Sequence, residues 1–371
     1  MQKYTLPFLL LVVSSAFAGV TVTSPANNST DASPVHYVAT ATTSCSKGVA
    51  AMGIYTAPGV LAYKVNGASL NTSLPLNAGT YNTVVQDWDN CGGYAKTPIT
   101  ITVSGGGGGS VPPSSHVFLL VEENHSYSQV IGNSSMPYLN SLANKYGLAL
   151  KYYANTHPSI GNYFMMTTGQ IITNNDGDCG TVSNDNIVRH LITAGKTWKS
   201  YAESLPYPAY TGCDTGAYVK RHNPFSYFTD VVNSSTEKWN LVPFTQFSKD
   251  LANNQLPEFS FIAPNVNDDA HNGTLSQADY WLKQNIAPLL ASSLFQKDGI
   301  LIIVFDESVS SDTQGGGGHV AALVIGPKVL PGHKSSVTYQ HQNTLKTLMQ
   351  ALGLTTFPGA ATNSSAMGDF F

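Results

Sequence analysis

The sequence predicts two folded units of different class: a small all-β module, then an α/β domain with a mainly parallel sheet sandwiched by helices. Three observations lead to this prediction. The chain has 371 residues, more than one domain usually contains. Five consecutive glycines at positions 105–109 divide it into two parts. Short β-branched runs precede these glycines, whereas apolar runs separated by helix-like stretches follow them.

Residues 1–18 have the features of a secretory signal peptide. A single lysine precedes an apolar run that is too short to span a bilayer, and Ala16-Phe17-Ala18 provides a small-residue cleavage site. We therefore expect cleavage after Ala18 and a secreted protein, extracellular or periplasmic. A buried N-terminal strand or an uncleaved anchor is the alternative.

Residues 19–104 are expected to form an immunoglobulin-like β-sandwich. Val20-Thr21-Val22, His36-Tyr37-Val38 and the run 99–103 alternate with turns rich in Asn, Pro and Gly. The Gly, Ser and Pro residues of segment 105–115 are typical of a linker, because ordering them costs more entropy than a core repays. Residues 116–371 are then the second domain, and a linker of this kind predicts that it folds separately.

The four cysteines are divided evenly by the glycine run. Export permits disulfides, and pairing within each half, Cys45 with Cys91 and Cys179 with Cys213, is the simplest arrangement. Four cysteines allow three connectivities, and free thiols are a further alternative.

The composition excludes one class of partner. Charged residues make up only 11% of the chain and the formal net charge is -4, so no positive field draws the protein to nucleic acid. We expect a monomer.

Polar residues follow several apolar runs of the second domain. Glu123-Asn124 comes after the run 117–121, and Asp306-Glu307 comes after the run 299–305. Asp269 and His271 follow the run 259–263, and His319 precedes a fourth run. Because ligands bind at the carboxyl ends of strands in open α/β sheets, we expect one convergent site for one or two divalent metal ions. Each acidic pair taken alone is more typical of a turn or a helix cap than of a metal site.

Ser159 is the candidate nucleophile. It lies in the segment His157-Pro158-Ser159 just before a helix-like stretch, where backbone N–H groups stabilise anions. A metal-activated serine hydroxyl there could attack a phosphoryl group. The alternative is an ordinary turn or N-cap serine.

The second domain resembles the phosphoesterase family of acid phosphatases and phosphatidylcholine-type phospholipases C, relatives of the alkaline phosphatase superfamily. The resemblance extends from His116 to about Gly353 and rests on ordered matches at 121–127, 157–163 with Gly169, 197–201, 220–225, 264–271, 278–282 and 305–307.

This resemblance implies an alkaline phosphatase-like fold and a role for each candidate residue. Those placed around a metal are Glu123, Asn124, Asp306 and Glu307, and those placed around the neighbouring position are Asp269, His271 and His319. The spacing of Ser159 from Asn162 and Gly169 matches that of the nucleophile in related nucleotide phosphodiesterases. The resemblance gives His157 and His222 phosphate-contacting or leaving-group-protonating roles, and a structural role is the alternative for both.

One departure favours the phosphatase branch. Phospholipase C members usually carry an acid directly before the histidine, where this chain has Gly318. The expected function is therefore that of a secreted, metal-dependent phosphoesterase of acid-phosphatase type. The alternatives are a phospholipase C that contacts lipid, and a surface- or glycan-binding protein whose enzyme domain is degenerate.

Overall fold

The computed structural model describes residues 19–32, 34–74, 76, 79–104 and 111–371. The proposed signal peptide and most of the glycine linker lie outside these residues. No helix in the described part of the chain has the length and apolar character that crossing a bilayer requires.

The N-terminal region is all β, as expected. One sheet has the strand order β1-β3-β6 and the other the order β2-β8-β7-β4-β5. Buried and exposed residues alternate along β3, so one face of this strand points into the apolar core. The described strands are β1 (Gly19–Ser24), β2 (Ser29–Ala32), β3 (Val35–Thr42), β4 (Val49–Ala57), β5 (Val60–Asn66), β6 (Ser69–Leu74), β7 (Gly79–Asp89) and β8 (Lys96–Ser104).

The second region is α/β, and this part of the fold prediction is confirmed. Its sheet has the order β12-β11-β13-β9-β14-β15-β10-β16, in which every neighbouring pair is parallel except the two pairs made by β15. The strands are β9 (Val117–Glu122), β10 (Gly147–Tyr152), β11 (Trp198–Ala202), β12 (Leu241–Pro243), β13 (Phe259–Ala263), β14 (Ile300–Phe305), β15 (Ala322–Ile325) and β16 (Lys334–Tyr339).

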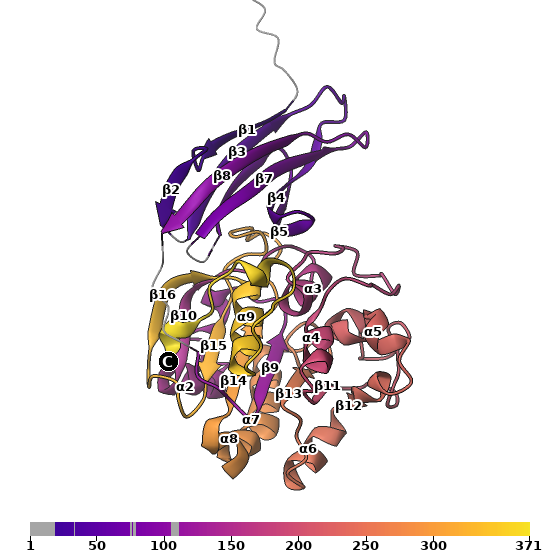
Figure 1. The fold of residues 1–371 in the computed structure, drawn as a ribbon. Coiled ribbons are helices and arrows are strands. Elements are labelled where there is room, and N and C mark those ends of the chain that lie inside the picture. The colour runs from indigo at the N-terminus through magenta and orange to yellow at the C-terminus, as the bar shows by residue number, and fades with distance from the viewer. Residues whose placement is uncertain (1–18, 33, 75, 77–78, 105–110) are drawn as a thin grey trace, which may run out of the picture.

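Helices cover this sheet. Helix α3 packs against α9 and α2 packs against α7, and α9 stands in front of the sheet in Figure 1. The α-helices are α1 (Tyr127–Val130), α2 (Pro137–Lys145), α3 (Ile160–Thr168), α4 (Ile187–Thr193), α5 (Thr229–Val232), α6 (Thr245–Ala252), α7 (Leu275–Ala291), α8 (Ser293–Asp298) and α9 (His341–Ala351). Short 3-10 helices are η1 (Lys220–His222), η2 (Pro224–Tyr227), η3 (Glu237–Asn240), η4 (Gly359–Thr362) and η5 (Gly368–Phe370).

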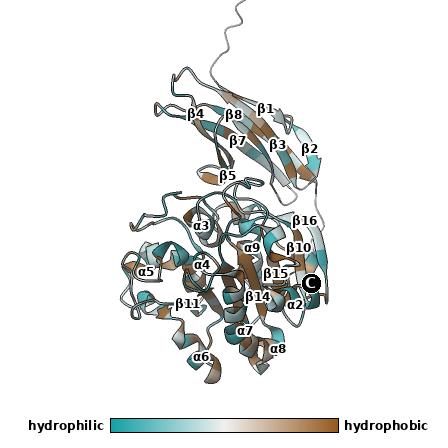
Figure 2. Ribbon diagram, turned by 180° about the vertical axis from the view of Figure 1, so that it is seen from behind, coloured by the Kyte–Doolittle hydropathy of each residue, from teal (hydrophilic) through white to brown (hydrophobic). Residues whose placement is uncertain are grey.

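The central strands explain why the sheet is sandwiched. Every residue of β9, β13 and β14 is buried, as parallel strands with both faces covered require. Figure 2 shows hydrophobic colouring along the centre of the sheet and a more polar periphery. The polar residues that follow these strands therefore emerge from an apolar core at one end of the sheet.

Both expected disulfides are present. Cys45 pairs with Cys91 in the N-terminal region, and Cys179 pairs with Cys213 in the second region. No cysteine of the described residues is free.

Candidate active site

The two acidic pairs lie side by side because β9 and β14 are parallel neighbours. Glu122 aligns with Phe305, and the Asp306 N–H donates to the Glu122 carbonyl over 2.9 Å. Glu123 and Asp306 thus leave adjacent strands at the same end of the sheet. Both side chains are fully buried, and Glu307 is nearly so.

Asp306 leaves one carboxylate oxygen without a partner. Its Oδ1 accepts from the backbone N–H groups of Glu307 and Asn124, the latter over 3.1 Å. Asn124 has a left-handed φ of 61°, which turns the chain after β9 toward this carboxylate. Asp306 Oδ2 is buried and has no hydrogen-bond partner among the described residues. A buried carboxylate oxygen without a hydrogen-bond partner is costly unless it binds a cation or a proton.

Ser159 lies between two of these acids. Its Oγ is 3.1 Å from Glu123 Oε2 and 3.2 Å from Glu307 Oε1. Ser159 is the N-cap residue of α3, yet its side chain makes no capping hydrogen bond to the helix. The Ile160 N–H is bound instead by Asp176 Oδ1. The Ser159 hydroxyl is therefore directed at the carboxylates of Glu123 and Glu307.

The two expected histidines flank the cluster. His157 Nδ1 is 2.7 Å from Glu307 Oε2, and its Nε2 is 2.9 Å from the Asp312 carbonyl. The His222 ring bridges two acids, with Nε2 2.8 Å from Glu123 Oε1 and Nδ1 3.0 Å from Asp269 Oδ2.

Asp269 is brought in by the loop after β13. The Glu123 N–H donates to the Asp269 carbonyl over 2.8 Å. Asp269 Oδ1 accepts the His271 N–H, and the His271 ring centroid lies 6.1 Å from that of His222. The structure therefore gathers Glu123, Asn124, His157, Ser159, His222, Asp269, His271, Asp306 and Glu307 at one end of the sheet.

His319 departs from the expectation. Its ring stacks on Tyr127 at 4.4 Å and contacts Tyr153 at 5.0 Å, and its Nε2 bonds the Leu150 carbonyl over 3.0 Å. None of these described contacts involves the acidic cluster. The aromatic sandwich and the carbonyl occupy the ring, so the structure does not place His319 beside Asp269 and His271.

Burial and mutual proximity shift the pKa values of these groups. Burial, together with the nearby Glu123 and Glu307, raises the pKa of Asp306 well above its usual range. Burial would also raise the pKa of Glu123, but the His222 ring outweighs it and lowers that pKa to about 2. Burial opposes the charged form of His222, yet Glu123 and Asp269 raise its pKa to about 9. The cluster thus holds the buried His222–Glu123 ion pair beside the Asp306 carboxyl group, whose Oδ2 has no hydrogen-bond partner among the described residues.

This donor set fits a divalent cation. Four acids, Glu123, Asp269, Asp306 and Glu307, converge with three imidazoles, those of His157, His222 and His271. Buried carboxylates are stable only when they are paired, protonated or bound to metal. Carboxylate and amide oxygens with nearby imidazoles are common ligands of divalent metals. Among the described residues, no three histidine or carboxylate ligand atoms of this cluster lie within 4.8 Å of one another.

Sequence reasoning missed three supporting residues. Tyr163 stacks on the His222 ring at 5.1 Å, Asp176 holds the first amide of α3, and His341 Nε2 lies 2.6 Å from the Asp306 carbonyl. Tyr163 belongs to the segment 157–163, which carries part of the family resemblance, so the sequence could have identified this residue. Asp176 and His341 come from a loop and a distant helix, and no local pattern identifies them.

The disulfide and a buried lysine fix the segment that carries His222. Lys220 Nζ donates to the carbonyls of Cys179 and Thr211, over 2.9 Å in each case, and lies 4.5 Å from the Tyr227 ring centroid. The Lys220 ammonium group therefore links the same two loop segments that the Cys179–Cys213 disulfide joins.

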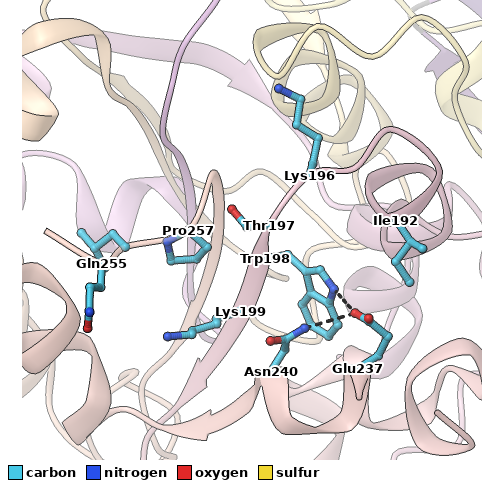
Figure 3. Close-up of a pocket in the computed structure, with 10 residues that line it drawn as sticks. Ile192, Lys196, Thr197, Trp198, Lys199, Glu237, Asn240, Gln255 and Pro257 are labelled. Carbon is cyan, nitrogen blue, oxygen red and sulfur yellow. Dashed lines mark hydrogen bonds between the residues drawn. The ribbon is translucent and has the colours of Figure 1, made fainter. Parts of the chain in front are cut away.

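A sizeable cavity lies elsewhere. It has a volume of about 610 Å³ and is lined by Trp198, Lys199, Glu237 and neighbouring residues at the amino ends of β11 and β13 (Figure 3). None of the expected catalytic or metal-binding residues lines it. The cavity and the acidic cluster are therefore two separate candidates for the active site. The cluster is the better candidate, because it holds the titratable and nucleophilic side chains.

Four glycines allow the loop after Glu307 to approach the segment before Ser159. The Gly317 N–H donates to the Ala154 carbonyl over 3.0 Å, and the Ala154 N–H donates to the Gly318 carbonyl over 2.9 Å. A Cβ atom at Gly318 would lie 1.7 Å from Ser308 Oγ, and φ there is 86°. The structure thus has no room for a side chain at position 318.

We predict that Gly318→Ala destabilises the protein by more than about 3 kcal/mol, since the clash with Ser308 adds to the strain of a left-handed φ. Gly353→Ala is the matched control, because Gly353 has a φ of 78° and nothing within 4 Å of its added Cβ. It should cost about 1 kcal/mol. Urea unfolding measures both, and equal losses would contradict the close approach at Gly318.

Comparison with known proteins shows the family to which this chain belongs. A model of the Phosphoesterase family matches residues 133–355. The chain is 32% identical to a Mycobacterium tuberculosis phosphatidylinositol-3-phosphatase over 72% of this chain and 86% of that protein. It is 30% identical to a probable acid phosphatase of Kluyveromyces lactis over 77% and 69% of the two chains. It is 31% identical to an Aspergillus fumigatus acid phosphatase over 62% and 53%.

Solved structures are similar to this chain at lower sequence identity than these relatives are. The lipoteichoic acid synthase LtaP of Listeria monocytogenes has a TM-score of 0.49 at 12% identity and covers 70% of this chain and 76% of its own. A Vibrio parahaemolyticus protein of the alkaline phosphatase superfamily has a TM-score of 0.46 at 15% identity, with 67% and 69% covered. The match of the family model to more than half of the 371 residues, together with a phosphatase one third identical over most of the chain, places this protein in the phosphoesterase family as a phosphoric ester hydrolase.

Proposed function

We propose that this protein is a secreted, metal-dependent phosphomonoesterase of acid-phosphatase type with Ser159 as its nucleophile. The observation that carries this proposal is the Ser159 hydroxyl, which lies 3.1 Å and 3.2 Å from two buried carboxylates and does not cap its helix. Secretion is supported by the two disulfides, which persist in oxidising compartments.

The residues that would hold a metal ion are Glu123, Asn124, Asp306 and Glu307. Asp269 and His271 lie beside them and could hold a second ion. A divalent ion there would favour the ionised serine hydroxyl and stabilise negative charge on the phosphoryl group. His319 is not part of this proposal, because its ring lies elsewhere.

The reaction follows from the positions of the protein groups. Ser159 Oγ attacks phosphorus and loses its proton to Glu307, whose Oε1 lies 3.2 Å away. The bond from phosphorus to the ester oxygen breaks, and the leaving alcohol takes a proton from His157, whose ring is held by Glu307. Water then attacks the phosphoseryl intermediate and gives a proton to His157, the bond from phosphorus to Ser159 Oγ breaks, and Oγ takes its proton back from Glu307 as inorganic phosphate is released.

The phosphatase activity is favoured over a phospholipase C activity by two observations. The named relatives described above are phosphatases. In addition, position 318 has no room for the acid that phospholipase C members usually carry there.

The first test compares two chromogenic substrates with added divalent metal. We expect rapid colour release from p-nitrophenyl phosphate and little from p-nitrophenylphosphorylcholine. Water-soluble phosphatidylinositol 3-phosphate is a third arm, motivated by the mycobacterial relative. Preference for the choline ester would favour the phospholipase alternative, and turnover of none would favour a binding protein with a degenerate enzyme domain.

Activity should disappear on removal of metal, because the buried carboxylates require a counter-charge. Dialysis against a chelator should abolish turnover, and adding a divalent metal should restore it. Asp306→Asn should lower metal content as measured by elemental analysis. Full turnover by a preparation shown to be free of metal would refute this part of the proposal.

Ser159→Ala should keep the fold and the bound metal but lose at least about a thousandfold in kcat, on the order of 4 kcal/mol. Ser292→Ala is the control, since the Ser292 side chain does cap its helix by accepting the Phe295 N–H. That variant should lose about 1 kcal/mol of stability and keep its rate. If Ser159→Ala behaves like the control, the nucleophile lies elsewhere.

A further inference from the structure

The N-terminal β region lies against the segments that frame the candidate nucleophile. In Figure 1, β5 stands directly over α3 and the C-terminal segment that contains η4. The linker alone predicts two units that fold separately. In the structure, however, buried residues of the two regions contact each other at the three places described next.

One contact reaches the segment before Ser159. Asn155 Nδ2 donates to the Ala62 carbonyl of β5 over 3.2 Å and to Gln342 Oε1 over 2.9 Å. The Asn155 N–H donates to Asn162 Oδ1 inside α3 over 2.9 Å. Asn155 is fully buried. This amide therefore joins β5 to the helix that begins after Ser159.

A second contact reaches the loop after Glu307. Tyr63 of β5 is 1% exposed. A Cβ atom at Gly316 would lie 2.8 Å from Tyr63 Cε2 and 2.0 Å from the Asn155 carbonyl oxygen. The bare backbone of Gly316 thus lies close to both the Tyr63 ring and the Asn155 carbonyl, where any side chain would clash with both. Replacing the Tyr63 ring by a smaller side chain would remove one of these two contacts.

A third contact is apolar. Met165 of α3, Ile171 just beyond it and Ala360 of η4 are buried in the core of the N-terminal region. Tyr81 of β7 donates from its hydroxyl to the Asn363 carbonyl over 3.0 Å. Helix α3 therefore shares a hydrophobic core with the β region.

We propose that the N-terminal β region is a positioning element of the active site, and that Tyr63 acts through Gly316 to hold the segments 153–158 and 308–318 in register. Ser159 and Glu307 adjoin these two segments. Small displacements of reacting groups are costly, since a shift of about 1 Å can lower a rate about a hundredfold. The β region is then required for turnover even though every candidate catalytic residue lies outside it.

The test uses the full chain with three substitutions. Tyr63→Ala removes the ring over Gly316, Tyr63→Phe keeps it, and Tyr37→Ala empties an equally buried site in the same β core, where the Tyr37 hydroxyl binds Thr83. The measurements are kcat and KM for p-nitrophenyl phosphate, hydrogen exchange of segments 153–158 and 308–318, and melting temperature.

We expect Tyr63→Ala to lower kcat by about tenfold or more with KM within about twofold, and to speed exchange in both segments. Tyr63→Phe should resemble the wild type. Tyr37→Ala should lower only the melting temperature. If Tyr63→Ala does not fold, Tyr63→Leu gives the same comparison.

A folded Tyr63 variant with unchanged kcat and exchange would overturn the inference, as would an equal loss of kcat in Tyr37→Ala. The activity readout rests on the proposed function, but the exchange readout does not. If the wild type hydrolyses no phosphate ester, the proposed function fails, and faster exchange confined to Tyr63→Ala still supports the positioning role.

Discussion

Buried negative charge at the end of the sheet is the constraint on which this structure depends. Parallel pairing of β9 and β14 places Glu123 beside Asp306 in an apolar core, where uncompensated carboxylates are costly. His222 offsets part of this charge by bridging Glu123 and Asp269. The rest is left to a proton or a cation, and this imbalance is the reason that we propose the cluster as the active site.

The surrounding chain serves to hold these groups despite their repulsion. The four-glycine loop after Glu307 lies against the backbone before Ser159 at distances that no side chain would permit. Lys220 and the Cys179–Cys213 bridge fix the segment that carries His222. Preorganisation of this kind is what an acid-rich site needs, since binding a ligand would otherwise have to repay the ordering of every loop.

Local sequence patterns revealed much of the site and only part of its support. The acid pairs after apolar strands, and the segment containing His157 and Ser159, predicted side chains that the structure brings together in one cluster. His319 shows the limit of that reasoning, because its described ring contacts are with Tyr127, Tyr153 and the Leu150 carbonyl, and none is with the acids. Asp176 and His341 were missed because their contacts join segments far apart in the chain.

The sequence by itself determined the two fold classes, the disulfide pairs and the residues with reactive side chains, because strand periodicity, cysteine distribution and residue chemistry are local properties. Only the tertiary structure decided that β15 runs antiparallel, that the Ser159 side chain leaves its helix uncapped, and that Tyr63 packs against Gly316. These features depend on which surfaces of distant segments meet, and the free energy that selects them comes from burial and packing, which no local pattern records.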